Sequence, residues 1–216
     1  MTFGKNNGSW PLRLPALLLI WLLLPGLAPI SLAQSSPQSE RAAEAPGWTV
    51  EQLIGSLAKS RQVEVRFEET AFSNLLTQPL KTRGILRFTP QAGLEKHITD
   101  PHDERYLVEG DMVLFESKPK GTSRTFSLHD YPALRAFIEA FRSTLANDVI
   151  TLRRFYSVTL QGEPRRWVLI LRPLDKAVQE LVESVRFSGE REDIGSIEIL
   201  APGGDRSVMV ITTGLP

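Results

Sequence analysis

The chain has 216 residues, no cysteine and a formal net charge of zero at pH 7, and 42% of its residues are hydrophobic. Without cysteine it forms no disulfide and carries no lipid-modified cysteine of its own. The balanced charge argues against a nucleic-acid-binding protein, which would present a basic face. The length suits one domain that buries a core of its own.

Residues 1–33 have the composition of a cleavable export signal, with two basic residues and no acidic one. The apolar run 14–24 is shorter than the roughly 20 residues that span a bilayer. Ser31 and Ala33 place small residues at the −3 and −1 positions of a signal-peptidase site. We expect cleavage after Ala33, which leaves a mature chain with a formal charge of about −2. An uncleaved membrane anchor is the alternative.

Residues 34–47 are rich in Ser, Pro, Ala and Glu and show no apolar period, which predicts a flexible lead-in. The folded domain is expected to cover 48–216. Thr49 and Gln52 have the spacing of a capping box, so a first helix is predicted to continue to about Ser60.

Alternation of apolar and polar residues then predicts strands, the first starting at Val63 and ending at Phe67. Polar residues between the apolar positions are expected on the wet face of the sheet. Pro90 is expected to end the second strand, and Glu109-Gly110-Asp111 is predicted to form a tight hairpin turn. Nine or ten strands follow from the whole pattern. Their short links imply an antiparallel meander, because parallel strands need crossovers of a dozen residues or more.

The centre of the chain is predicted to be helical. Asp130 is a candidate N-cap, and Pro132 suits the first turn of the helix that follows. One apolar stripe runs along this helix, at Leu134, Phe137, Ile138, Phe141 and Leu145. A second, shorter helix is predicted to begin with Asn147 or Asp148 as its cap and to end near Phe155, and a brief third one is predicted over 175–182.

A single sheet with so many strands must curl or close, and its concave face must be covered. The amphipathic central helices are the apolar covers that the sequence offers. Their stripe fits either a lid over a cavity or ordinary core packing, and both interpretations stay open at this point. The fold class is therefore α+β and mostly β.

Motifs for catalysis are missing from the sequence. It has no Gly-x-Ser-x-Gly elbow, no phosphate-binding glycine loop, no Gly-x-Gly-x-x-Gly and no His-Glu-x-x-His. Glu95, His97, His102 and Asp103 are the one candidate set for a metal site, but charged groups around a turn are more often solvated. His129 is expected to belong to a helix cap. We expect no catalytic residue, no metal and no cofactor.

The order of several short motifs resembles the LolA-like outer-membrane lipoprotein carriers of Gram-negative bacteria, in their LolA-related branch. The resemblance covers about 48–212 and is carried by Val65-Arg66-Phe67-Glu68-Glu69, Gly84-Ile85-Leu86-Arg87-Phe88-Thr89-Pro90, Leu107-Val108-Glu109-Gly110-Asp111-Met112-Val113, Trp167-Val168-Leu169-Ile170-Leu171-Arg172-Pro173 and Asp205-Arg206-Ser207. It implies a strongly curved, unclosed antiparallel half-barrel whose helices form a lid over the concave face.

The resemblance also implies a periplasmic, monomeric carrier that binds the acyl chains of lipoproteins or another lipid, and no nucleic acid. An inner-membrane donor complex and an outer-membrane acceptor are the implied partners. The cavity is expected to be lined by Val65, Phe67, Leu86, Phe88, Leu94, Val113 and Phe115 from the strands and by Leu134, Phe137 and Phe141 from the helix.

Two positions depart from the family pattern. Thr89 stands where family members carry an arginine that bonds toward the lid, and Lys96 stands where they carry a tryptophan. The cargo is therefore either a lipoprotein or another acylated molecule. Two other functions remain: a periplasmic lipid-sensing adaptor of the same fold without transport, and a hydrolase with a polar cluster in its cavity.

Overall fold

The computed structural model describes residues 48–59, 64–89 and 93–212. The predicted export signal, the lead-in, Ser60, Val63 and Pro90 lie outside these residues. In the described part of the chain, no helix is long and apolar enough to cross a membrane.

One antiparallel sheet dominates the molecule and has the order β6-β5-β4-β3-β2-β1-β11-β10-β9-β8-β7. It has eleven strands rather than the predicted nine or ten, because every short alternating run forms a strand of its own. The strands are β1 (Glu64–Phe72), β2 (Leu80–Thr89), β3 (Gly93–Asp100), β4 (Glu104–Glu109), β5 (Met112–Ser117), β6 (Thr122–Ser127), β7 (Tyr156–Glu163), β8 (Arg166–Pro173), β9 (Ser184–Glu190), β10 (Asp193–Leu200) and β11 (Arg206–Thr212).

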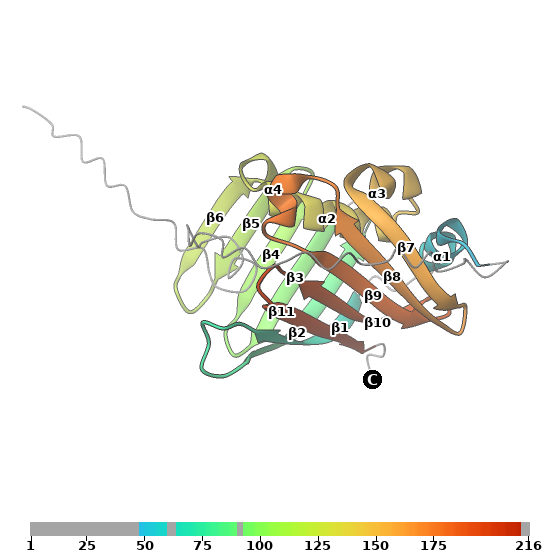
Figure 1. Ribbon diagram of the computed structural model, residues 1–216. Coiled ribbons are helices and arrows are strands. Elements are labelled where there is room, and N and C mark those ends of the chain that lie inside the picture. Colours follow the sequence, from blue (N-terminus) through green and yellow to red (C-terminus); the bar gives the residue numbers. More distant parts are fainter. Residues whose placement is uncertain (1–47, 60–63, 90–92, 213–216) are drawn as a thin grey trace, which may run out of the picture.

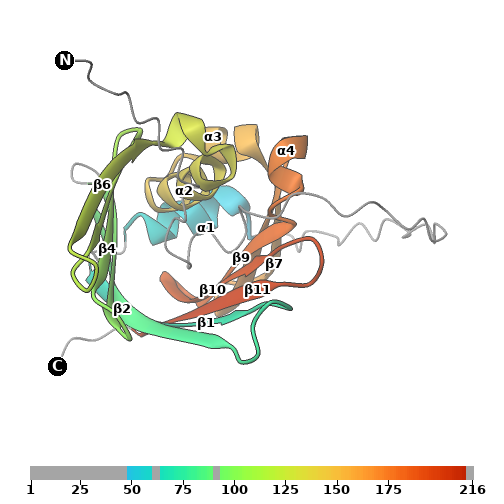
Figure 2. The same cartoon turned by 90° about the vertical axis from the view of Figure 1, so that its left-hand side faces the viewer.

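The two halves of the chain meet where β1 pairs with β11, with Phe67 opposite Ile211. Strands β6 and β7 are the two edges of the sheet, and the central helices connect them. The sheet curves strongly but stays open between these edges (Figures 1 and 2). Figure 2 shows α2, α3 and α4 at the open side of the curve, between its two arms. The predicted mostly β fold with an unclosed, curved antiparallel sheet is confirmed.

In the described residues, four α-helices and one short 3-10 helix accompany the sheet: α1 (Val50–Leu57), η1 (Leu128–Asp130), α2 (Pro132–Leu145), α3 (Val149–Phe155) and α4 (Lys176–Gln179). The predicted capping box is confirmed, since Thr49 Oγ1 accepts from the Gln52 amide at 3.2 Å and the Thr49 amide donates to the Gln52 side chain at 2.9 Å. This cap fixes the start of α1.

The predicted cap of α2 is wrong. Asp130 belongs to η1, as does His129, and the cap position of α2 is Tyr131, which makes no side-chain capping bond. Pro132 opens α2, where its missing N–H costs nothing. Of the two candidates for α3, Asp148 is the cap, and its carboxylate accepts from the Thr151 amide at 2.9 Å.

Most of the strong sequence patterns place apolar side chains on the concave face. Trp167 on β8 is fully buried and donates from Nε1 to the carbonyl of Arg191 at 2.9 Å. Its register partner is Gly189 on β9. A Cβ at Gly189 would lie 2.4 Å from the Trp167 ring, so only glycine leaves room for the indole there.

Candidate functional site

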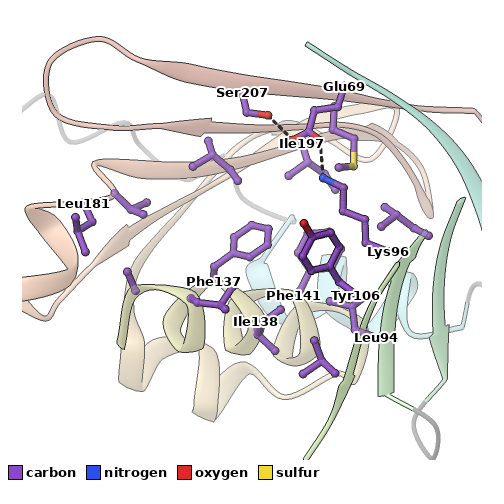
Figure 3. Close-up of a pocket in the computed structure, with 17 residues that line it drawn as sticks. Glu69, Leu94, Lys96, Tyr106, Phe137, Ile138, Phe141, Leu181, Ile197 and Ser207 are labelled. Carbon is purple, nitrogen blue, oxygen red and sulfur yellow. Dashed lines mark hydrogen bonds and ion pairs between the residues drawn. The ribbon is translucent and has the colours of Figure 1, made fainter. Parts of the chain in front are cut away.

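A cavity of about 100 Å³ lies between α2 and the concave face of the sheet (Figure 3). Strands from both halves of the chain form its floor, and Leu181 and Val182 close one side after α4. Nearly all of its lining is aliphatic or aromatic. Such a wall suits a hydrocarbon, because most of its area has no hydrogen-bonding group for a polar metabolite.

The structure brings only half of the predicted site residues to this cavity. Five of the ten line it: Leu86, Leu94, Leu134, Phe137 and Phe141. The other five lie in or against the surrounding core: Phe67, Val113 and Phe115 are fully buried, and Val65 and Phe88 are partly buried. Alternation along a strand predicts the face of a side chain but not how far along the strand the hollow extends.

Helix α2 covers the cavity through its aromatic stripe. The ring centroids of Phe137 and Phe141 are 5.4 Å apart, and Phe141 lies at the same distance from Phe187 on β9, with both pairs edge to face. Helix α2 also contacts α1, α3 and α4. Its apolar side is therefore packed against the sheet and the other helices, and Ala133, Leu134 and Ile138 line the cavity together with the two aromatic residues.

The size of the cavity limits what it holds without movement. An engineered cavity of about 150 Å³ accommodates benzene, and pockets for drug-sized ligands span about 300–1,000 Å³. A hollow of about 100 Å³ is smaller than either. A long acyl chain therefore fits only if the cavity widens.

An arginine on α2 ties this helix to the rim of the sheet. Arg142 donates from Nη1 to the carbonyl of Gly110 at 2.8 Å and from Nη2 to the carbonyl of Val108 at 3.5 Å. Gly110 lies in the predicted hairpin turn between β4 and β5, which is confirmed. This contact joins α2 to the turn between two strands of the sheet.

One end of the cavity wall is charged. Glu69 on β1 is 5% exposed and forms an ion pair with Lys96 on β3. Ser207 Oγ donates to Glu69 Oε1 at 2.6 Å, and Thr82 Oγ1 donates to Oε2 at 3.4 Å. Burial alone would raise the pKa of Glu69, but the positive charge of Lys96 and these hydrogen bonds outweigh it, so the pKa is lowered. The carboxylate is therefore ionised at neutral pH.

Tyr106 on β4 adds a hydroxyl to this charged end, directly across the strand pair from Lys96. Its side chain is buried, and its hydroxyl makes no hydrogen bond within the part of the chain that the structure describes. Burial is the main cause that raises the pKa of Tyr106, followed by the charge of the Glu104 carboxylate, hydrogen bonding toward that carboxylate and the charge of Glu69. The hydroxyl therefore stays protonated, and Glu104 is near it without forming a well-aligned hydrogen bond in the described residues.

The sequence prediction missed Glu69 and Lys96 as cavity residues. The expected wet face comprised the polar residues between the apolar positions, and Glu69 is not one of them. The signal was present, because the alternation that points Val65 and Phe67 inward continues to Glu69, and Leu94 likewise leads to Lys96. A charged residue at an inward position of a strand is the pattern that would have identified both.

The candidate metal set does not converge. Glu95 accepts hydrogen bonds from Arg87 at 3.1 Å and from Arg105 at 2.8 Å on the convex face. His97 Nε2 lies 2.9 Å from Asp103 Oδ1, and Lys118 donates to the other oxygen of that carboxylate at 2.6 Å. Within the described residues, no group of three or more potential ligands is placed to hold a metal ion.

The family model described as "Outer membrane lipoprotein carrier protein LolA-like" matches residues 42–214, most of the chain. No curated protein matches the sequence.

Solved structures are similar at low identity. A LolA superfamily protein from Nitrosomonas europaea is 11% identical, with 78% of this chain and 96% of that chain covered and a TM-score of 0.41. LprF from Mycobacterium bovis is 12% identical (77% and 93% covered, TM-score 0.34). A putative outer membrane lipoprotein-sorting protein domain from Vibrio parahaemolyticus is 9% identical (77% and 92% covered, TM-score 0.40). The family assignment rests on the sequence match alone.

Proposed function

Since the chain belongs to the LolA-like family of outer membrane lipoprotein carrier proteins, we propose that it is a periplasmic carrier. It binds the acyl chains of a lipoprotein or another lipid between α2 and the sheet and shuttles them from the inner toward the outer membrane. The observation that carries the proposal is the apolar cavity under the aromatic side of α2. The export signal predicted over 1–33 agrees with a periplasmic location.

The energetics of acyl chains explain why such a carrier needs an apolar hollow. Burying one methylene is worth roughly 0.8 kcal/mol, so a chain of about 15 methylenes gains on the order of 12 kcal/mol on leaving water. A free chain therefore does not cross an aqueous compartment at a useful rate. A soluble protein that replaces the membrane must offer an apolar surface of similar extent, and the concave face with α2 supplies it.

Opening of α2 is the step that admits cargo in this proposal. The apolar residues of α2 would leave the sheet and cover the acyl chain instead, as a lid does. The Arg142 contact with the Gly110 carbonyl would hold the lid in its closed position. This bond takes over, in our proposal, the role of the family arginine that is Thr89 here.

The direct test is displacement of a fluorescent acyl probe. Phe137→Asp places a charge on the cavity wall, and we expect it to abolish probe uptake because a buried unpaired carboxylate is strongly disfavoured. Ile150→Asp is the matched control, since Ile150 lies on the neighbouring helix α3 and is 85% exposed. Circular dichroism establishes that both variants are folded. Unchanged uptake by the Phe137 variant would refute the site.

A carrier and a lipid-sensing adaptor differ in whether they transfer lipid between two membranes. A carrier moves a labelled lipid between donor and acceptor vesicles at a rate that increases with protein concentration. A lipid-sensing adaptor binds the same probe without accelerating transfer. Binding without transfer would therefore favour the adaptor over the carrier.

A further inference from the structure

Burying the charged groups at this end of the cavity costs free energy, and the stability of the fold does not explain their presence. Glu69 and Lys96 face a wall that is otherwise apolar, and Figure 3 shows their ion pair at the upper edge of the hollow. A buried ion pair is weak evidence for stability, because desolvation of both charges offsets their attraction. Two apolar side chains would close this end at no such cost.

This end also has hydrogen-bonding capacity that the protein does not use. A lysine ammonium has three N–H donors, and among the described residues Nζ of Lys96 donates to one acceptor, Glu69. The Tyr106 hydroxyl is a second donor that makes no well-aligned hydrogen bond among the described residues, although Glu104 is nearby. Lys96 and Tyr106 are cross-strand partners on β3 and β4, so their donors serve the same region of the cavity. Buried donors without partners are rare and destabilising, which points to an acceptor supplied by a ligand.

The surrounding charges decide what kind of acceptor fits. Lys96 is already neutralised by Glu69, whose own oxygens are satisfied by Ser207 and Thr82. Glu104 is a second carboxylate near the Tyr106 hydroxyl, and it is already paired with Lys120 at 3.4 Å and accepts from Ser117 at 3.3 Å. A carboxylate or phosphate would therefore approach two carboxylates and a lysine that is already paired. An uncharged carbonyl oxygen accepts the same hydrogen bonds without that repulsion.

We propose that Lys96 and Tyr106 anchor the polar end of a neutral acyl ester or amide by donating hydrogen bonds to its carbonyl oxygens. The hydrocarbon tail then extends from them along the apolar wall under Phe137 and Phe141. This inference rests on the proposed function and specifies its cargo: an esterified or amide-linked acyl chain rather than a free fatty-acid anion. Glu69 is a positioning residue that holds the Lys96 ammonium at the wall.

Three ligands of similar length distinguish the contribution of the carbonyl group to binding from that of the tail. They are methyl laurate, laurate and tridecane. Each is titrated at neutral pH against the wild-type protein loaded with the fluorescent acyl probe. Methyl laurate should displace the probe at a lower concentration than either laurate or tridecane. Laurate binding more tightly than its methyl ester would overturn the inference, and so would equal affinity of methyl laurate and tridecane.

Two variants assign the effect to the proposed residues. Tyr106→Phe removes only the hydroxyl, and the double variant Glu69→Gln/Lys96→Met removes both charges together. Each should lower the ratio of methyl laurate affinity to tridecane affinity by about three- to tenfold, the range of one or two hydrogen bonds. Tyr131→Phe, on a tyrosine that does not line the cavity, is the control and should keep the ratio.

An unchanged ratio in both cavity variants would refute the role of Lys96 and Tyr106. That outcome is distinct from failure of the proposed function, in which the wild-type protein takes up no acyl probe and none of the three ligands binds. In the first case the apolar cavity still binds tails, but its charged end has no part in choosing them.

Discussion

Replacing Lys96 with methionine tests whether the buried pair behaves as the geometry requires. The substitution keeps a long side chain that still packs on Phe67, whose ring centroid lies 5.2 Å from Nζ. It leaves the Glu69 carboxylate without its counter-charge at 5% exposure. Breaking a buried pair from one side costs about 3–5 kcal/mol.

The lower end of that range applies here, because Ser207 and Thr82 continue to donate to Glu69 after the substitution. A loss of about 3 kcal/mol in the free energy of unfolding corresponds to a decrease in Tm of roughly 6–12 °C for a domain of this size. The double variant Glu69→Gln/Lys96→Met has no unpaired charge. It should lie within about 1 kcal/mol of the wild-type protein.

Urea unfolding followed by tryptophan fluorescence measures the free energy of unfolding of the wild-type protein, the single variant and the double variant. The values are compared only if the m-values are equal. Lys81→Met on β2 is the matched control, since Lys81 is exposed and should change stability by less than about 0.5 kcal/mol. The reasoning is refuted if Lys96→Met costs no more than this control. It is equally refuted if the double variant is as unstable as the single one.

Three further outcomes follow from the same structure. Arg142→Met removes the donor to the Gly110 carbonyl. It should accelerate probe association about fivefold in stopped-flow mixing, as expected when the closed position of α2 loses about 1 kcal/mol of stabilisation. An unchanged rate would contradict the role of Arg142 in holding α2 closed. The lowered pKa of Glu69 means that its stabilisation is complete above the ordinary value of 4.5 and is lost as pH falls through the folded-state pKa. The Glu69→Gln/Lys96→Met variant should therefore lose less stability on acidification than the wild-type protein, as measured by urea unfolding at several pH values. Parallel plots of unfolding free energy against pH would contradict this expectation. Gly189→Ala should destabilise by about 1–3 kcal/mol through overpacking, whereas Gly195→Ala, whose nearest neighbour is 3.8 Å away, should be tolerated in thermal melts.

Local patterns in the sequence were sufficient for the fold. The capping box at Thr49 and the alternation that starts β1 depend on neighbours a few residues apart, so they are visible without the structure. The antiparallel order followed from short links between strands. The cap of α2 was mispredicted because Asp130 is drawn into the 3-10 turn before the helix, and two adjacent turns compete for the same residues.

The site was only partly predictable for a different reason. Whether an inward residue meets the hollow or the packed core depends on where α2 crosses the sheet, which is a long-range property. Phe67 and Leu86 both point inward from neighbouring strands, but only Leu86 lines the cavity. The pair of Glu69 and Lys96 joins residues 27 positions apart in sequence, and no local rule connects them.

The closed position of α2 explains, within the proposal, how one cavity both holds and releases a hydrocarbon. Burying Phe137 and Phe141 against the sheet is worth roughly 1.5–3 kcal/mol per side chain, or about 3–6 kcal/mol together. A chain of about 15 methylenes must displace these contacts, so its gross gain of about 12 kcal/mol falls to about 6–9 kcal/mol. That net value corresponds to dissociation constants from a few tenths of a micromolar to some tens of micromolar, roughly. Such a carrier would retain its cargo in water and give it up to a membrane or an acceptor, in which the whole gain is available without a lid to displace.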